Sequence, residues 1–108
     1  MNSHPVLKAN PTLQDLQRYI ADTLEHRKLT DSSLQDEFIM LVEEVGELAK
    51  ALRKHTGHKM DITAPDVNVR HEAADVLWML VATCNKLGID LEEAVREKEE
   101  HNKHRTWR

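Results

Sequence analysis

The chain has 108 residues, a formal net charge of −4 and only 4% aromatic residues. Its length fits one domain, which we place at residues 12–108 behind a flexible N-terminal arm at residues 1–11. The negative charge argues against binding to a nucleic-acid polymer, because such binding requires a basic surface. The sequence holds neither the roughly 20 consecutive apolar residues that span a bilayer nor a secretion signal, so we expect a cytoplasmic protein with no membrane partner.

Apolar residues at helical spacing predict an all-α fold, with two helices in the first half of the chain. The first, at about residues 12–27, has an apolar stripe made of Leu13, Leu16, Ile20 and Leu24. The second, at about residues 34–55, follows several candidate N-cap residues and repeats apolar residues at three- and four-residue steps. Residues 56–68 show no such pattern and include Gly57 and Pro65. They indicate a long loop of the kind that often has a function, such as a lid.

The second half of the chain predicts a strongly apolar helix followed by a charged one. The third helix, at about residues 69–87, is apolar on nearly all sides along its middle, so we expect it to be the most enclosed element. Cys84 is the only cysteine and lies in this apolar run, which favours a buried structural thiol over a nucleophile. A capping box at Asp90 and Glu93 then opens a fourth helix that ends near His104.

Two pairs of acidic residues stand at i and i+3 on the second and third predicted helices, Glu44 with Glu47 and Glu72 with Asp75. This spacing places both carboxylates of a pair on one face, with Cβ atoms about 5–6 Å apart. Enclosing several carboxylates is costly unless they are protonated, hydrated or bound to a cation. Oxygen ligands suit Mg²⁺, with Mn²⁺ as a substitute, so antiparallel packing of the two helices would gather both pairs around one or two ions.

Simpler interpretations exist for each of these features. Glu-x-x-Glu is common on solvated helices, and only the combination of both pairs with a long amphipathic helix and a very apolar one favours a metal site. The seven histidines, His55 and His58 among them, suggest a second metal site, but no further ligand cluster joins them and solvent exposure is the simpler interpretation. Trp78 could stack on a base, yet its apolar helix favours a place in the core.

Four segments of the chain together resemble the MazG-like all-α nucleoside triphosphate pyrophosphohydrolases. The segments "EEVGELAKAL" and "HEAADVLWMLV" are similar to the two central helices of that family, "LQDLQRYIADTLEHRKL" to its first helix and "KEEHNKHRTW" to its closing phosphate-binding segment. The likeness covers about residues 13–107. It departs at residues 56–68, which match no family segment, and in the first helix, which lacks the Trp that some members place against the base.

The resemblance implies a role for each acidic candidate. In the family, the residues corresponding to Glu44, Glu47, Glu72 and Asp75 hold Mg²⁺. Glu43 adjoins the first ligand, and the resemblance suggests it as the general base that takes a proton from the attacking water. Glu47 is an alternative for this role, and a solvated surface position is the competing interpretation for Glu43.

The resemblance also implies contacts to the substrate phosphates. Lys98, Asn102 and Arg105 stand at i, i+4 and i+7, so they share one face of the fourth predicted helix. The corresponding family positions contact phosphates. For Lys98, a solvated position on a charged helix is an equal alternative.

These inferences describe a four-helix MazG-like bundle unit that assembles into a homo-oligomer, because the third helix has more apolar circumference than one bundle layer covers. The resemblance implies a dimer or a tetramer. The expected reaction is the Mg²⁺-dependent hydrolysis of a ribo- or deoxyribonucleoside triphosphate to monophosphate and pyrophosphate, in nucleotide-pool house-cleaning. The alternatives are a phosphoribosyl-ATP pyrophosphohydrolase and a non-catalytic helical metal-binding interaction module.

Overall fold

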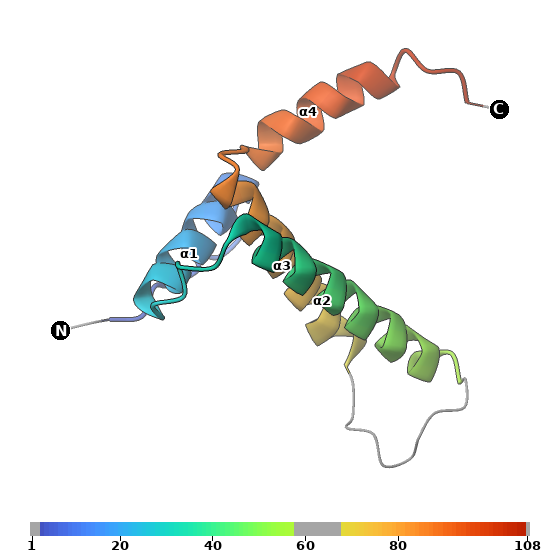
Figure 1. Cartoon of the computed structure of the whole chain (residues 1–108). Helices are drawn as coiled ribbons and strands as arrows, with labels where there is room; N and C mark the ends of the chain where they lie inside the picture. Colours follow the sequence, from blue (N-terminus) through green and yellow to red (C-terminus); the bar gives the residue numbers. More distant parts are fainter. Residues whose placement is uncertain (1–2, 58–67, 108) are drawn as a thin grey trace. The chain divides into compact units, whose positions relative to one another are not determined.

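The computed structural model describes residues 3–57 and 68–107 (Figure 1). These residues form helices and no strand, and the helices are α1 (Leu13–His26), α2 (Leu34–His55), α3 (Val69–Lys86) and α4 (Leu91–Asn102). The prediction of an all-helical chain is confirmed for this part, and each helix begins and ends close to its expected bounds. The loop expected at residues 56–68 lies mostly outside the described residues. None of the described helices is long and apolar enough to cross a membrane.

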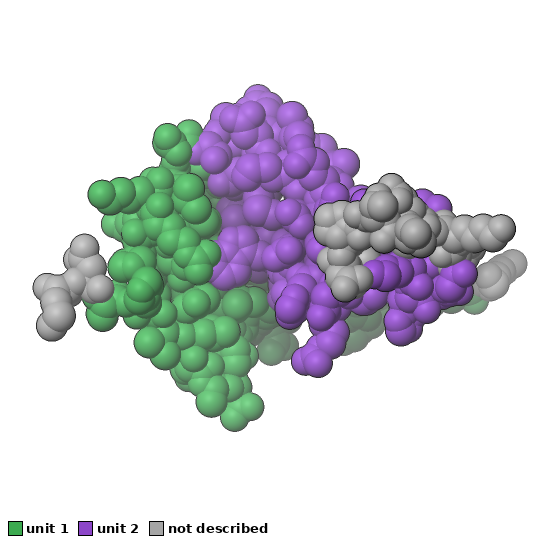
Figure 2. Space-filling view, turned by 90° about the horizontal axis from the view of Figure 1, so that it is seen from below, with its two compact units in different colours: residues 1–31, 84–108 green, residues 32–83 purple. Residues whose placement is uncertain are grey.

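The chain divides into two compact units (Figure 2). The terminal unit consists of residues 1–31 and 84–108, and the central unit consists of residues 32–83. The terminal unit contains α1, α4 and the last residues of α3, and α1 packs against α4. The central unit contains α2 and most of α3.

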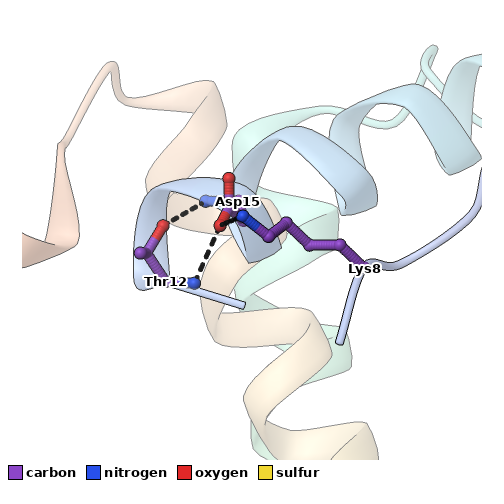
Figure 3. A network of polar contacts seen from close by, with 3 residues as sticks. All are labelled: Lys8, Thr12 and Asp15. Atoms are coloured by element: carbon purple, nitrogen blue, oxygen red, sulfur yellow. Dashed lines mark hydrogen bonds and ion pairs between the residues drawn. The ribbon is translucent and has the colours of Figure 1, made fainter. Parts of the chain in front are cut away.

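A capping box fixes the start of α1. Thr12 Oγ1 accepts a hydrogen bond from Asp15 N at 3.0 Å, and Asp15 Oδ2 accepts one from Thr12 N at 2.9 Å (Figure 3). These bonds occupy N–H groups that a helix N-terminus leaves without intrahelical partners. The hydrogen bonds from Thr12, its backbone N–H first, and the charge of Lys8 at 3.4 Å hold the pKa of Asp15 below its ordinary value. The arm before α1 also contacts the other end of the helix, because the rings of His4 and His26 lie 4.8 Å apart.

One face of α2 is apolar and exposed. Its side chains are 49–58% exposed and recur at helical spacing, and they belong to Phe38, Ile39, Val42, Val45 and Leu52. We call these five residues the α2 apolar face. On other sides of the helix, Glu37 and Ala51 are only 5% and 1% exposed. These five side chains leave apolar surface in contact with solvent on this side of α2.

Burial in α3 is concentrated at its C-terminal end. Val81 is 0% exposed and Cys84 is 7% exposed, whereas Leu77 and Leu80 are 43% and 41% exposed. The prediction that this helix is the most enclosed element therefore holds for its end and not for its middle. Burial raises the pKa of the Cys84 thiol, in agreement with a structural role. Gly88, at φ +69°, ends the helix region in a conformation that suits glycine.

The start of α4 follows the sequence prediction in part. Asp90 is the N-cap, and its Oδ1 accepts a hydrogen bond from Glu93 N at 3.0 Å. The helix ends at Asn102 rather than near His104. Arg105 therefore lies beyond the helix, and only Lys98 and Asn102 share the helical face that the i, i+4 and i+7 spacing predicted for all three residues.

Candidate metal centre

Three carboxylates of the central unit lie close together. Glu44, Glu72 and Asp75 each offer one oxygen, and these oxygens all lie within 4.8 Å of one another. Glu44 comes from the middle of α2, and the other two residues come from the start of α3, where the chain runs in the opposite direction (Figure 1). The i, i+3 spacing places Glu72 and Asp75 on one face of α3. We call this group the acidic cluster.

The acidic cluster fits a small divalent cation. Oxygens that bind one Mg²⁺ at about 2.1 Å lie no more than about 4.2 Å apart, so small side-chain rotations would let all three residues share one ion. Carboxylate oxygens are also the ligands that Mg²⁺ and Mn²⁺ prefer. Glu44 and Glu72 are partly buried, whereas Asp75 is exposed.

The raised pKa of Glu44 also agrees with a site for a divalent cation. Its partial burial raises its pKa above the ordinary value for glutamate, because burial disfavours the charged carboxylate. The negative charges of four neighbouring carboxylates raise the pKa further, in the order Asp75, Glu72, Glu47 and Glu43. A bound divalent cation would counter both effects, since it favours the ionised form.

Glu43 and Glu47 lie beside the acidic cluster. Both side chains are exposed, and neither supplies an oxygen to the group of three. They are near enough for their charges to act on Glu44. The structure thus brings together three of the four predicted metal ligands, Glu44, Glu72 and Asp75, and places the fourth ligand and the predicted base nearby.

The predicted phosphate-binding residues belong to the terminal unit. Lys98 is exposed and takes part in no ion pair within the described part of the chain. By contrast, Arg96 of α4 pairs with Glu92, and Lys103, which follows the helix, pairs with Glu100. The Arg105 guanidinium lies 4.6 Å from the centroid of the Trp107 ring. Asn102 is partly buried, and its Oδ1 has no hydrogen-bond partner among the described residues.

The other candidates from the sequence are histidines and Trp78. Within residues 3–57 and 68–107, the acidic cluster is the one group of at least three potential metal ligands, and it contains no histidine. His55 and His71 are exposed, and His58 lies outside the described residues. Trp78 is partly buried, which agrees with the interpretation as a core residue.

Sequence reasoning overlooked Gln17. Its side chain is 9% exposed and hydrogen bonded to the segment between α3 and α4. A signal was present, because Gln17 falls within the apolar stripe of the first helix, at the i+4 position from Leu13 and the i−3 position from Ile20. Most buried polar side chains have hydrogen-bond partners, so a glutamine in such a stripe is a candidate for a buried hydrogen-bond network.

The fold and the site together define a class: an all-helical protein whose carboxylates converge from two helices and suit a divalent cation. The sequence model of the MazG nucleotide pyrophosphohydrolase domain matches residues 33–106, which is most of the chain. The chain therefore belongs to the MazG nucleotide pyrophosphohydrolase domain family. This result confirms the resemblance inferred from the sequence motifs.

One protein from Bacillus subtilis agrees with this assignment in both sequence and structure. The chain is 44% identical over 55 residues to the uncharacterized protein YpjD of strain 168, and the match spans 50% of this chain and 50% of that relative. The chain therefore matches about half the length of this curated relative. A crystal structure of B. subtilis YpjD, described provisionally as a pyrophosphatase, gives a TM-score of 0.77 at 28% identity and covers 92% of this chain and 100% of that one. Together, the family and this structure support a pyrophosphatase-type hydrolase.

Proposed function

We propose that the protein is a Mg²⁺-dependent nucleoside triphosphate pyrophosphohydrolase that converts a ribo- or deoxyribonucleoside triphosphate and water into the monophosphate and pyrophosphate. Membership of the MazG family supports the type of reaction. The convergence of Glu44, Glu72 and Asp75 is the observation that carries the metal dependence. We further propose that the protein acts in the cytoplasm, where it removes unwanted nucleotides.

In this proposal, some acidic residues bind the metal ion and one acts as the general base. Glu44, Glu72 and Asp75 hold Mg²⁺ or Mn²⁺, and Glu47 is a further ligand. A bound ion would supply positive charge that offsets the charge of the phosphates and would make a water more acidic. Glu43 takes the proton from the water that attacks the α-phosphorus, the bond from this phosphorus to the bridging oxygen breaks, and pyrophosphate leaves. Glu47 is the alternative base.

Cations are needed because the protein and its substrate are both negatively charged. The chain carries a formal charge of −4, and a nucleoside triphosphate adds about four negative charges. We propose that Lys98, Asn102 and Arg105 bind the phosphates. The exposed, unpaired ammonium of Lys98 and the guanidinium of Arg105 support this role. Arg96 of α4 and Lys103 just beyond it are already paired with glutamates.

A substrate panel tests the proposed function. Release of pyrophosphate is measured with standard and modified nucleoside triphosphates and with phosphoribosyl-ATP, each with Mg²⁺ or Mn²⁺. We expect turnover of at least one nucleoside triphosphate, and its loss in Glu44→Gln and Asp75→Asn with helicity retained. Asp36→Asn is the matched control, because Asp36 is an exposed carboxylate of α2 outside the acidic cluster.

Two results would contradict the proposal in different ways. Turnover of phosphoribosyl-ATP alone would identify the alternative enzyme. Retained Mg²⁺ binding with no pyrophosphate release from any compound would favour a non-catalytic interaction module instead.

A further inference from the structure

Gln17 in α1 joins three parts of the terminal unit through one side chain. Its Nε2 donates hydrogen bonds to Asn85 Oδ1 and to the Ile89 carbonyl oxygen, both at 2.8 Å. Its Oε1 accepts a hydrogen bond from Leu91 N at 2.9 Å. Asn85 Nδ2 donates in return to the backbone oxygen of Gln17 at 2.9 Å. We call Gln17 and Asn85 the amide clamp.

The amide clamp satisfies groups that would otherwise need water. Leu91 is the first residue of α4, where the backbone N–H has no intrahelical partner, and the Ile89 carbonyl lies in the connection before that helix. Gln17 is 9% exposed, so these bonds are largely shielded from solvent. A partner lost from such a site leaves a buried polar group unsatisfied, which costs more than the loss of an exposed hydrogen bond.

The remainder of α4 has little other support. None of its residues is buried, and beyond the partly buried Leu91 and Ala94 only Asn102 is not exposed. The ion pair between Arg96 and Glu92, at 3.0 Å, lies within the helix and does not attach it to another element. The direction of α4 against α1 therefore depends largely on the bonds at its first turn.

A small change of direction at the first turn becomes a large displacement further along. At about 1.5 Å per residue, Lys98 lies about 10 Å and Asn102 about 16 Å along the axis from Leu91. A tilt of about 10° at the first turn would move Asn102 by about 3 Å. A misplacement of about 1 Å can cost an enzyme about 100-fold in rate, because its groups must meet the substrate in a defined geometry.

We propose that Gln17 is a positioning residue, which through the amide clamp fixes the direction of α4 and thereby sets the affinity of the protein for the phosphates of its substrate. The part of this inference that concerns affinity rests on the proposed function. The part that concerns the direction of α4 is measured without activity.

Three variants distinguish the loss of the hydrogen bonds of the amide clamp from the general effect of substituting a glutamine in α1. Gln17→Glu keeps the size of the side chain but removes both donors, so that a carboxylate faces the Ile89 carbonyl. Gln17→Met keeps the length and removes all polar groups, which provides a second test if the charged variant does not fold. Gln14→Glu is the matched control, because Gln14 is an exposed glutamine on the same helix.

Spin-label distances test the direction of α4. Nitroxide labels are placed at Glu25→Cys in α1 and Glu97→Cys in α4, two exposed positions, in a Cys84→Ala background. Labelled protein is diluted with unlabelled protein, so that label pairs within one chain dominate. We expect a narrow distance distribution in the background protein and in Gln14→Glu, and a broad or shifted one in both Gln17 variants. Equally narrow distributions at the same distance in all four proteins would overturn the proposal.

Calorimetric titration with inorganic tripolyphosphate and Mg²⁺ tests the affinity for phosphates without a base or a turnover step. We expect the two Gln17 variants to bind tripolyphosphate about 10-fold or more weakly, measured well below their melting temperatures. Their affinity for Mg²⁺ alone should be unchanged, because the acidic cluster lies in the central unit. A merely structural role would lower the melting temperature and leave the affinity of the folded protein unchanged.

The outcomes distinguish the positioning role from the proposed function. A broadened distance distribution with unchanged tripolyphosphate affinity would overturn the positioning role of Gln17 and leave the proposed function intact. Tripolyphosphate binding that depends on Gln17, together with no pyrophosphate release from any nucleotide, would support the positioning role and contradict the proposed function. Failure of the unsubstituted protein to bind tripolyphosphate would overturn the positioning role, whereas the substrate panel alone decides the proposed function.

Discussion

At the scale of single residues, Glu44 has the most distinctive environment. It is partly buried and close to four other carboxylates, so its pKa is raised. In the metal-free protein, the folded state therefore holds a proton on Glu44 more strongly than the unfolded chain does. The contribution of Glu44 to the free energy of unfolding falls as pH rises from the ordinary pKa of glutamate through the raised value, and the full penalty remains above it.

Because the ionised Glu44 lowers the free energy of unfolding, a prediction follows for the metal-free Glu44→Gln variant. At pH 7 the variant should have a higher free energy of unfolding than the wild-type protein, because it removes the cost of an ionised carboxylate among other carboxylates. The difference should shrink as pH falls to the ordinary pKa of glutamate and below it, because the folded and unfolded wild-type chains then both hold the proton. Urea denaturation with a chelator present measures both values.

The same experiment with Mg²⁺ should reverse the order. Mg²⁺ binds the folded wild-type protein and raises its free energy of unfolding, whereas the variant lacks one ligand. Asp36→Asn should gain as much stability from Mg²⁺ as the wild-type protein does, because Asp36 lies outside the acidic cluster. A metal-free Glu44→Gln protein that is less stable than wild type at pH 7 would show that the repulsion inferred around Glu44 is not significant.

The Glu43→Gln variant distinguishes a role of Glu43 as general base from a role as metal ligand. If Glu43 takes the proton from water, kcat should fall by roughly two to four orders of magnitude, while KM and the Mg²⁺ affinity stay close to normal. Steady-state kinetics over a range of Mg²⁺ concentrations measure all three quantities. Recovery of the rate at high Mg²⁺ would instead identify Glu43 as a ligand. An unchanged kcat would place it on the solvated face, and Glu47→Gln would then be the next variant to examine.

At the scale of elements, capping determines where α1 begins. Thr12→Ala removes the oxygen that accepts a hydrogen bond from Asp15 N, so we expect the free energy of unfolding to fall by about 1 kcal/mol. Thr30→Ala is the matched control, because Thr30 is exposed and lies outside the helices. Urea denaturation of both variants measures the difference. Equal effects of the two substitutions would mean that the capping box contributes little.

At the scale of the whole molecule, we propose that two or more copies assemble into a dimer or a tetramer. The sequence placed the excess apolar surface on the third helix, but the α2 apolar face is more exposed than Leu77 and Leu80 of α3. Burying such a face against a second copy would remove it from water, which stabilises the assembly. The α2 apolar face is therefore our candidate for the contact between copies.

Light scattering tests this assembly. At micromolar concentration we expect a mass of at least twice 12.5 kDa for the wild-type protein. Val42→Lys introduces a charge into the α2 apolar face and should shift the mass toward 12.5 kDa. Val6→Lys is the control, because Val6 is an 87% exposed valine outside this face. A wild-type protein of 12.5 kDa would refute the assembly, and an unaffected mass in Val42→Lys would place the contact elsewhere.

The sequence by itself determined the helices and the pairs of acidic residues, because both depend on local spacing. The expected bounds of α2, residues 34–55, agree with the structure, since a serine cap and a long apolar repeat mark them. The i, i+3 spacing was enough to place Glu72 and Asp75 on one face. The family followed from motifs that are themselves local, and the family match confirms it.

The tertiary structure decided which of these groups meet. Helical spacing relates residues within one helix, but the distance from Glu44 to Glu72 and Asp75 depends on how α2 and α3 pack, and this packing leaves Glu47 outside the group of three. The amide clamp joins Gln17 to groups 68 to 74 residues away, a pairing that no local pattern encodes. Burial also depended on tertiary packing. The amphipathic pattern of α2 shows which residues are apolar, but only packing determines which faces of the helix stay exposed to solvent.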